Sequence, residues 1–162
     1  MRFNKYIKSI ISAAVLFTDG VRFLSCKPTN LNYWEIPKGT TDGGELPINA
    51  AIREFKEETG LKLIDPKLKM IVLFDNRGRI LGQKQNPEDW LVQVYQAEDY
   101  TGELKEEKPT ARLVWVENSD YLKLKVHEGD KKIWELLNQP GIFEVVARYD
   151  KEELISFDYV RV

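Results

Sequence analysis

The segment REFKEETGL, Arg53–Leu61, decides how the rest of this chain is interpreted. It places Glu54, Glu57 and Glu58 within five residues. Positions three and four apart are neighbours on an α-helix, so Glu54 would face both other carboxylates, and each like-charged pair costs about 0.2–0.5 kcal/mol. Such a patch is either a solvated acidic face or a set of ligands whose repulsion is relieved by a bound cation.

The flanking residues predict a helix over Pro47–Thr59. Pro47 suits the first turn of a helix, and Gly60 is placed as its C-terminal stop. Ile48, Ile52 and Phe55 recur at helical spacing and give the helix one apolar face. The acidic patch is therefore expected on a helix that packs against a core.

The loop before this helix favours the cation interpretation. It is rich in glycine, and a glycine lets a backbone carbonyl turn toward an ion. Arg53 and Lys56 are each one residue from a glutamate, so we expect them to point elsewhere on the helix. Glu45 stands at the helix N-terminus, where a carboxylate favours the helix dipole, so it could also be a simple cap. Hard divalent cations such as Mg²⁺ prefer oxygen ligands.

The whole segment resembles the Nudix box, the signature of the Nudix hydrolases. Every fixed position and spacing is present: Gly39-x5-Glu45-x7-Arg53-Glu54-x2-Glu57-Glu58-x-Gly60-Leu61. Phe55 is the one departure, since a smaller aliphatic residue is commoner there. The resemblance implies an α/β fold, the Nudix-type α/β/α sandwich with a mixed sheet. It also implies hydrolysis of a nucleoside diphosphate linked to another group, with Mg²⁺ or, as a substitute, Mn²⁺.

The resemblance also implies roles for individual residues. The implied metal ligands are Glu54, Glu57, Glu58 and the carbonyl of Gly39. Arg53 would pair with Glu45 and hold the loop on the helix. The general base varies in this family, so it could be Glu57 or a glutamate of a later loop, here Glu106 or Glu107. The plainer interpretation of that later pair is a solvated hairpin loop.

Two further resemblances concern the substrate. The C-terminal half is similar to MutT-type oxidised-purine triphosphate hydrolases, with His127-Glu128-Gly129-Asp130 at the start of the second helix. There Asp130 would accept hydrogen bonds from a purine edge, or simply cap the helix. His127 replaces a tryptophan that would stack on the base, or has no special role.

The stretch YWEIPKG, residues 33–39, is similar instead to dinucleoside polyphosphate hydrolases. Lys38 would suit an extra phosphate, or be a solvated lysine. Trp34 would line the base pocket or pack the loop. Three functions are thus open: a nucleoside triphosphate diphosphohydrolase that releases a monophosphate and pyrophosphate, a dinucleoside polyphosphate hydrolase, and a nucleotide-sensing module without catalysis.

Chain length, net charge and cysteine content limit the class of protein to which this chain can belong. A chain of 162 residues predicts one domain, residues 1–162, and a net charge of −2 gives no basic field for nucleic acid. The single cysteine, Cys26, fits a reducing cytoplasm and a small core residue. The apolar run 10–17 has the length of one strand and falls short of the about 20 residues of a membrane span. The sequence leaves a homodimer open.

Alternating apolar residues predict most of the sheet. Strands are expected over residues 10–17, 21–26, 68–75, 90–97 and 113–116. The first two should form a hairpin around Asp19-Gly20, and a second hairpin near Asp150-Lys151 should close the chain. A second helix is predicted over Asp130–Asn138, with Gly141 following as a stop.

Overall fold

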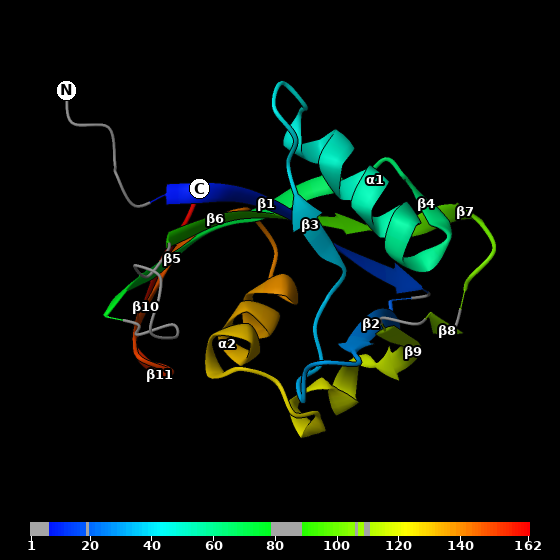
Figure 1. Cartoon of the computed structure of the whole chain (residues 1–162). Helices are drawn as coiled ribbons and strands as arrows, with labels where there is room; N and C mark the ends of the chain where they lie inside the picture. Colours follow the sequence, from blue (N-terminus) through cyan, green and yellow to red (C-terminus); the bar gives the residue numbers. More distant parts are fainter. Residues whose placement is uncertain (1–6, 19, 79–88, 106, 109–110) are drawn as a thin grey trace.

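The structure, a computed structural model, describes residues 7–18, 20–78, 89–105, 107–108 and 111–162. A long twisted sheet forms the middle of the molecule, with one helix on each face (Figure 1). The helices are α1 (Pro47–Thr59) and α2 (Glu128–Leu137), with a short 3-10 helix, η1 (Asn118–Lys123), before α2. The strands are β1 (Ile7–Thr18), β2 (Arg22–Pro28), β3 (Lys38–Thr40), β4 (Leu61–Ile64), β5 (Lys67–Gly78), β6 (Asp89–Ala97), β7 (Asp99–Gly102), β8 (Glu107–Lys108), β9 (Ala111–Glu117), β10 (Phe143–Asp150) and β11 (Glu153–Arg161).

The main sheet is mixed, as expected. Its strand order is β11-β10-β5-β6-β1-β2-β9-β8, with β3 paired to β1, and β4 and β7 form a separate ribbon. β1 runs parallel to β6 and β5 runs parallel to β10, while the other pairs are antiparallel. The prediction of an α/β sandwich with a mixed sheet is confirmed.

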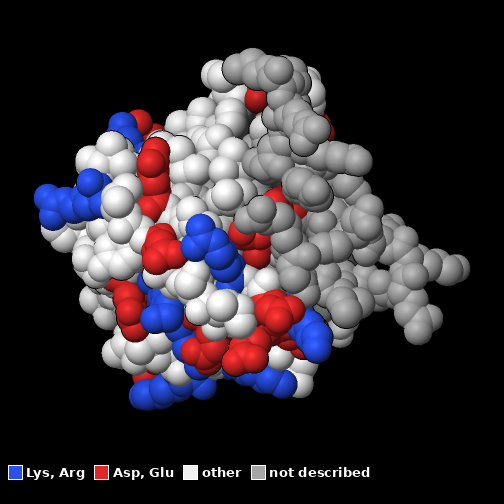
Figure 2. All heavy atoms as spheres, turned by 90° about the vertical axis from the view of Figure 1, so that its left-hand side faces the viewer, with Lys and Arg blue, Asp and Glu red and all other residues white. Residues whose placement is uncertain are grey.

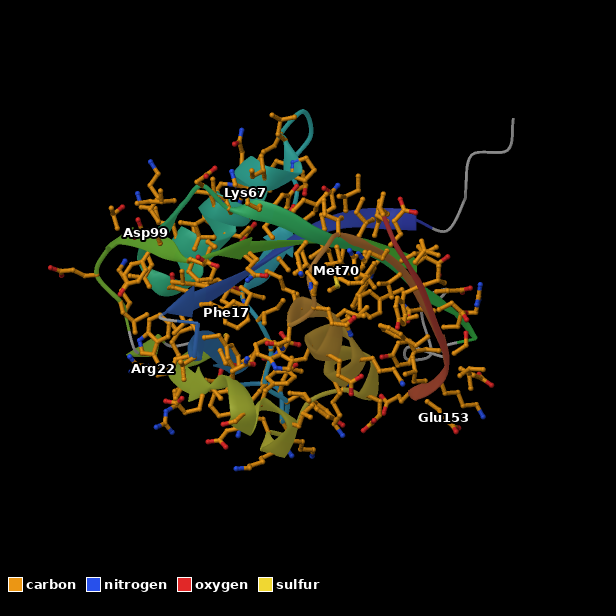
Figure 3. All side chains as sticks on the ribbon, turned by 180° about the vertical axis from the view of Figure 1, so that it is seen from behind. Phe17, Arg22, Lys67, Met70, Asp99 and Glu153 are labelled. Atoms are coloured by element: carbon orange, nitrogen blue, oxygen red, sulfur yellow. The ribbon has the colours of Figure 1, made fainter. Side chains whose placement is uncertain are left out.

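Strand alternation builds a core on each face of the sheet. Along β1, Ala13 and Val15 belong to the cluster that packs on α2, whereas Ala14 and Leu16 belong to the cluster beneath α1. Figure 3 labels two more members of the α2 cluster, Phe17 and Met70. Both faces of β1 are therefore buried, and the run 10–17 is the central strand that its apolar pattern predicted.

The helix α1 has the predicted bounds. Pro47 is at its start, and Gly60 ends it with φ 84°, a left-handed conformation that glycine adopts without strain. Phe55 is 1% exposed and anchors the helix to the core beneath it. The residue before the helix is Leu46, which makes no side-chain cap. Glu45 therefore does not cap the helix, and its carboxylate is used elsewhere.

Other predictions need correction. The helix α2 begins at Glu128, so Asp130 lies inside its first turn and is not the N-cap, a position that His127 occupies. The first hairpin forms, but β1 and β2 pair only at Phe17–Phe23 and Thr18–Arg22, whereas β2 pairs with β9 over Arg22–Pro28 along its other edge; Asp19 lies outside the described residues. The predicted C-terminal hairpin, by contrast, is confirmed, and it turns at Lys151, whose φ is 56°.

The surface and cysteine agree with the composition. Acidic and basic side chains are intermingled over the described part of the face in Figure 2, as a net charge near zero suggests. Cys26, the single cysteine of the chain, is buried. Within the described ranges, none of the helices has the length and apolar character that a membrane crossing requires.

Candidate active site

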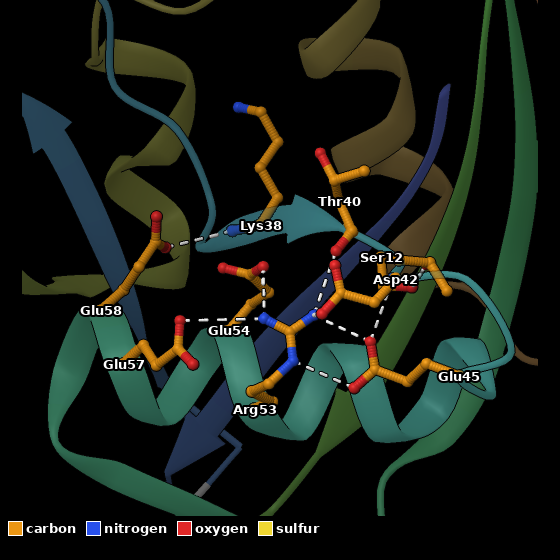
Figure 4. A network of polar contacts seen from close by, with 10 residues as sticks. Ser12, Lys38, Thr40, Asp42, Glu45, Arg53, Glu54, Glu57 and Glu58 are labelled. Carbon is orange, nitrogen blue, oxygen red and sulfur yellow. Dashed lines mark hydrogen bonds and ion pairs between the residues drawn. The ribbon is translucent and has the colours of Figure 1, made fainter. Parts of the chain in front are cut away.

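Three glutamates of α1 lie on the side of the helix that faces β3 (Figure 4). Glu54 is the most tightly placed, because a Cβ at Gly39 would lie 1.9 Å from the Glu54 Cδ. Only a residue without a side chain leaves room for this carboxylate beneath β3. The glycine predicted to matter at position 39 therefore matters first for steric reasons.

Arg53 connects the loop, the strand and the helix. Its Nε and Nη2 donate to the two Glu45 carboxylate oxygens over 3.0 and 2.8 Å, which is the expected pair. Nη2 also donates to the Thr40 carbonyl over 3.1 Å, and Nη1 donates to Glu54 Oε1 over 2.7 Å. The expectation that Arg53 points away from the acidic patch is wrong, because its long side chain folds back along the helix.

This pairing fixes the charges of both partners. Hydrogen bonds from Arg53 lower the pKa of the Glu45 carboxyl, and hydrogen bonds to Glu45 and Glu54 raise the pKa of Arg53. Arg53 thus stays cationic and partly neutralises the glutamate patch. The guanidinium of Arg53 contacts one side of the glutamate patch. The other side is exposed to solvent at Glu57, whose side chain is 60% exposed.

The backbone of β3 also contacts the patch. The Lys38 N–H donates to Glu58 Oε2 over 3.2 Å. In an antiparallel pair, successive residues direct their N–H and C=O groups alternately toward and away from the partner strand. The Ala14 N–H donates to the Pro37 carbonyl over 3.1 Å and the Thr41 N–H donates to the Ile10 carbonyl over 2.9 Å, two positions on either side of the pair Ser12–Gly39. The Gly39 carbonyl is therefore directed at β1, and the carbonyls directed away from β1 are those of Lys38 and Thr40.

The donor set fits a hard cation in its chemistry. Glu54, Glu57 and Glu58 offer carboxylate oxygens on one helix face, and β3 adds carbonyl oxygens, which is what Mg²⁺ prefers. Within the described ranges, no three acidic, histidine or cysteine side chains converge on one point as a metal cage would require. Glu54 is turned to Arg53 and Glu58 to Lys38, so these carboxylates are occupied by hydrogen bonds of the protein.

The later loop reaches the end of the same helix. The Lys105 N–H donates to the Thr59 carbonyl over 2.8 Å, which ties the loop to the C-terminal end of α1. Glu107 follows as the first residue of β8 and pairs with Arg112 in β9. Glu106 and the Glu107 side chain lie outside the described residues. The backbone thus brings the candidate base segment to the end of α1 that carries Glu57 and Glu58.

A cavity of about 300 Å³ lies on the other side of β3, between the sheet and α2. Its apolar walls include Ile11, Val72, Val92, Val94, Ile133 and Leu137. Its charged lining residues are Glu35, Lys38 and Asp130, and His127 also lines it. Glu35 Oε2 binds the Lys38 ammonium over 2.6 Å. Sequence reasoning missed Glu35, although its position three residues before Lys38 was the available signal.

Of the remaining predicted substrate residues, some line the cavity and one does not. His127 lines the cavity and stacks on Tyr33, with ring centroids 4.0 Å apart and planes 19° apart. Trp34 does not line the cavity; its side chain packs against the core, and its backbone N–H donates to the Lys125 carbonyl over 2.9 Å. Burial raises the pKa of the Asp130 carboxyl, while the charges of Lys38 and His127 act in the opposite direction. Asp130, His127 and Lys38 are therefore brought together, and Trp34 is not.

Comparisons with known proteins agree with this geometry. The sequence profile of the NUDIX domain matches residues 9–137. The chain is 30% identical over 149 residues to the uncharacterized Nudix hydrolase YvcI of Bacillus subtilis, covering 91% of each chain. It is 26% identical over 157 residues to an RNA pyrophosphohydrolase of Pelagibacter ubique, covering 83% of this chain and 96% of the relative.

Its fold is similar to that of a crystal structure of a mutator MutT protein from Bacillus halodurans, with a TM-score of 0.82 at 23% identity over 94% of this chain and 97% of the other. The family profile covers most of the chain, and the residues of the box occupy one site in the structure. The chain therefore belongs to the NUDIX domain family and is a Nudix hydrolase.

Proposed function

We propose that this protein uses Mg²⁺ to hydrolyse a phosphoanhydride bond of a nucleoside triphosphate, giving a nucleoside monophosphate and pyrophosphate. The observation that carries the proposal is the position of β3. Lys38 lines the nucleoside-sized cavity with its side chain, while its backbone N–H contacts Glu58 of the acidic helix. A nucleotide whose base enters the cavity would therefore carry its phosphates toward the glutamates.

Each residue of the box then has a physical task. Glu54, Glu57 and Glu58 would hold the metal together with a carbonyl of β3. When bound, Mg²⁺ neutralises phosphate oxygens and lowers the pKa of a coordinated water. Arg53 orients Glu54 through the bond of 2.7 Å, and Gly39 leaves the space that Glu54 occupies.

A carboxylate must take the proton from the attacking water. Glu57 is the exposed member of the patch, so its carboxylate is accessible to a water molecule. Its Oε2 also lies 3.8 Å from Arg53 Nη1. Glu107 is the second candidate, because its loop is tied to the end of α1. Because Glu57 is also a proposed metal ligand, Glu107→Gln is the variant that separates the candidates: it should lower kcat strongly if Glu107 is the base and leave kcat near that of the wild type if Glu57 is the base.

Two other substrates are each favoured by one observation. The Lys38 ammonium, which is paired to Glu35 in the lining of the cavity, would suit an extra phosphate of a substrate such as a dinucleoside polyphosphate. The relative from Pelagibacter ubique is named an RNA pyrophosphohydrolase, which favours a 5′-triphosphorylated RNA. The nucleotide-sensing module without catalysis is less favoured, because a pure binder has no need of all three glutamates.

A substrate panel tests these proposals. The purified protein is incubated with Mg²⁺ and, separately, GTP, ATP, 8-oxo-dGTP, diadenosine tetraphosphate and a 5′-triphosphorylated RNA oligonucleotide, and the products are identified. A monophosphate with pyrophosphate from a triphosphate supports the proposal, whereas ATP with AMP from the tetraphosphate supports the second candidate. Samples with EDTA report uncatalysed breakdown. No turnover of any member would leave the sensing module.

We propose further that residues 1–162 work as one domain. β10 and β11 lie beyond the match to the family profile, yet β10 pairs in parallel with β5 of the same sheet. A single, buried cysteine, Cys26, is compatible with the reducing cytoplasm, which is the proposed location. The proposed partner is a small nucleotide, and a homodimer would be detected by light scattering.

A further inference from the structure

The face of the main sheet that carries α1 is only partly covered. In Figure 1, α1 lies over one end of this face, and β5, β6 and β10 extend beyond it. Among the described residues, the apolar cluster beneath α1 contains no residue of β10 or β11. Apolar side chains nevertheless continue across the uncovered part. They form the outer patch, which consists of Ile10, Ile71, Leu73, Leu91, Val146 and Val160.

Four members of the outer patch form one row across four strands. Ile10 of β1 is the register partner of Leu91 in β6. Leu73 of β5 is in turn the register partner of both Leu91 and Val146 of β10. Register partners project to the same face of a sheet, and residues next to them in sequence project to the opposite face. Val72 is buried in the cluster beneath α2, so the row lies on the other face, beside α1.

The outer patch is accessible to solvent. Ile10 is 42% exposed and Val160 is 59% exposed, while the members of the row on β5, β6 and β10 are half-buried. A shallow groove of about 380 Å³ follows the patch from Leu91 and Leu73 to Val146 and Val160. The largest apolar patch on the surface of a monomer is often a functional surface. The patch is therefore a candidate binding surface for a macromolecule.

Two opposite charges on β10 flank the row. Glu144 and Arg148 lie two residues to either side of Val146, so all three side chains project to the same face. At about 3.4 Å per residue, the two charges are about 14 Å apart along the strand. Arg148 Nη1 donates to Asp158 Oδ2 over 2.8 Å, but a guanidinium has five N–H donors and can bind a further carboxylate. Glu144 is exposed and forms no ion pair with another described residue.

This arrangement is complementary to itself. A two-fold axis along the row would place β10 of a second copy above β10 in the antiparallel direction. Each Glu144 would then face the partner's Arg148, and the apolar row would face the partner's row. We infer that the outer patch binds a second copy of this chain in this orientation. A two-fold dimer is the commonest homo-oligomer, because one self-complementary patch serves both copies. The inference does not depend on the proposed reaction, and the cavity beneath the opposite face stays accessible.

The dimensions of the outer patch indicate a weak dimer. From β1 to β11 the face spans four strand spacings of about 4.8 Å, which is about 19 Å. Along β5 it extends from Ile71 to Asp75, about 14 Å at about 3.4 Å per residue. A standard interface buries about 800 Å² on each partner, and this face is smaller. We therefore expect reversible association with a dissociation constant in the micromolar range.

Sedimentation velocity over a series from low to high micromolar protein tests the inference. The wild type should shift reversibly from monomer to dimer as the concentration rises. Val146→Asp should remain monomeric at every concentration, because it would bury an unpaired carboxylate at the centre of the interface. Glu144→Lys should raise the dissociation constant by about 10-fold or more, because it places a cation against the partner's Arg148.

Matched controls make the same changes outside the outer patch. Val21→Asp changes a valine that is 52% exposed between β1 and β2. Glu152→Lys changes an exposed glutamate in the turn between β10 and β11. Both controls should dimerise like the wild type, and equal thermal unfolding midpoints would show that all the variants fold. Glu144 is exposed, so Glu144→Lys tests the inference even if Val146→Asp fails to fold.

A crosslink tests which surface forms the dimer. Val146 lies on the proposed two-fold axis, so two Val146→Cys chains should be joined by a short bismaleimide, whereas two Val21→Cys chains should not. The native Cys26 is buried and should not compete. A wild type that is monomeric at every concentration, or a dimer that both Val146→Asp and Glu144→Lys leave intact, would overturn the inference. A dimer in which Val146→Cys is not crosslinked, as pairing through the edge of β11 would give, would also overturn it.

Discussion

Replacing Gly39 by alanine should damage catalysis much more than folding. The added methyl group would lie 1.9 Å from the Glu54 Cδ and 2.2 Å from its Oε2. An ordinary contact begins near 3.4 Å, so the carboxylate must move by about 1.5 Å, the difference between 3.4 and 1.9 Å. The atoms that must move are at the end of a flexible side chain, which keeps the cost in folding free energy small.

The functional cost follows from the same displacement. Glu54 Oε1 is held by Arg53 Nη1 over 2.7 Å, and a shift of that size exceeds what a hydrogen bond tolerates. A misplacement of about 1 Å in a catalytic site can cost about 100-fold in rate. We therefore expect kcat/KM of Gly39→Ala to fall by about 100-fold or more, with a higher Mg²⁺ concentration at half-maximal rate.

Initial rates measured across a Mg²⁺ series, with urea unfolding of the same samples, check this prediction. Gly43→Ala is the matched control, because it changes a glycine of the same loop whose added methyl group meets nothing within 4 Å. The control should keep both activity and unfolding midpoint. A Gly39→Ala protein with wild-type rates and the wild-type Mg²⁺ dependence would refute the idea that this glycine makes room for Glu54.

Three further substitutions test other parts of the structure. Glu57→Gln should lower kcat by about 10²–10⁴-fold, as loss of a base or metal ligand predicts, without changing the unfolding midpoint; a near-normal rate would remove Glu57 from the site. Arg53 lowers the pKa of Glu45, so the pair stabilises the folded state at pH values above 4.5, the ordinary pKa of a glutamate. This stability is lost as the pH falls through the lower pKa that Glu45 has in the folded state. Glu45→Gln should thus be less stable than wild type at neutral pH and lose less stability in an acid titration of the urea midpoint; parallel curves would contradict this. Gly129→Ala would place a methyl group 2.2 Å from Tyr149 Oη, at the end of a rigid ring, so its free energy of unfolding should fall by about 1–3 kcal/mol. An unchanged urea midpoint would show that α2 moves aside at little cost.

Local signals explain why α1 was predicted residue for residue. Pro47 and Gly60 determine the ends of the helix through backbone conformation within one turn. The spacing of Ile48, Ile52 and Phe55 indicates the buried face, and this spacing can be recognised from the local sequence alone. The same holds for the long strands, where alternation alone distinguishes the two faces. The bounds of α2 were less accurate because neither end of that helix carries a strong cap.

The parts of the site that were missed depend on distant contacts. β3 has three residues between a proline and a glycine-rich loop, and it becomes a strand only because β1 pairs with it. The direction of Arg53 is set by Glu45 and Thr40, which helical spacing alone does not place. The stack of His127 on Tyr33 joins segments more than ninety residues apart in number. Sequence spacing identified the chemistry of the patch, but it could not say which groups face one another.

The short strand β3 lies between the acidic site of α1 and the cavity, and adjacent residues of β3 contribute to one or to the other. Its alternation sends the Lys38 side chain into the cavity and leaves the missing Gly39 side chain as space for Glu54, while the Lys38 N–H and the Thr40 carbonyl contact α1. In the proposed function, the reaction and the selection of substrate would therefore use different atoms of adjacent residues. Changes at Gly39 should lower the rate for every substrate alike, whereas changes at cavity-lining residues such as Asp130 should alter the relative rates of different substrates. In the proposed function, the box would therefore determine the bond that is cut, and the cavity residues, which lie mostly outside the box, would select the substrate.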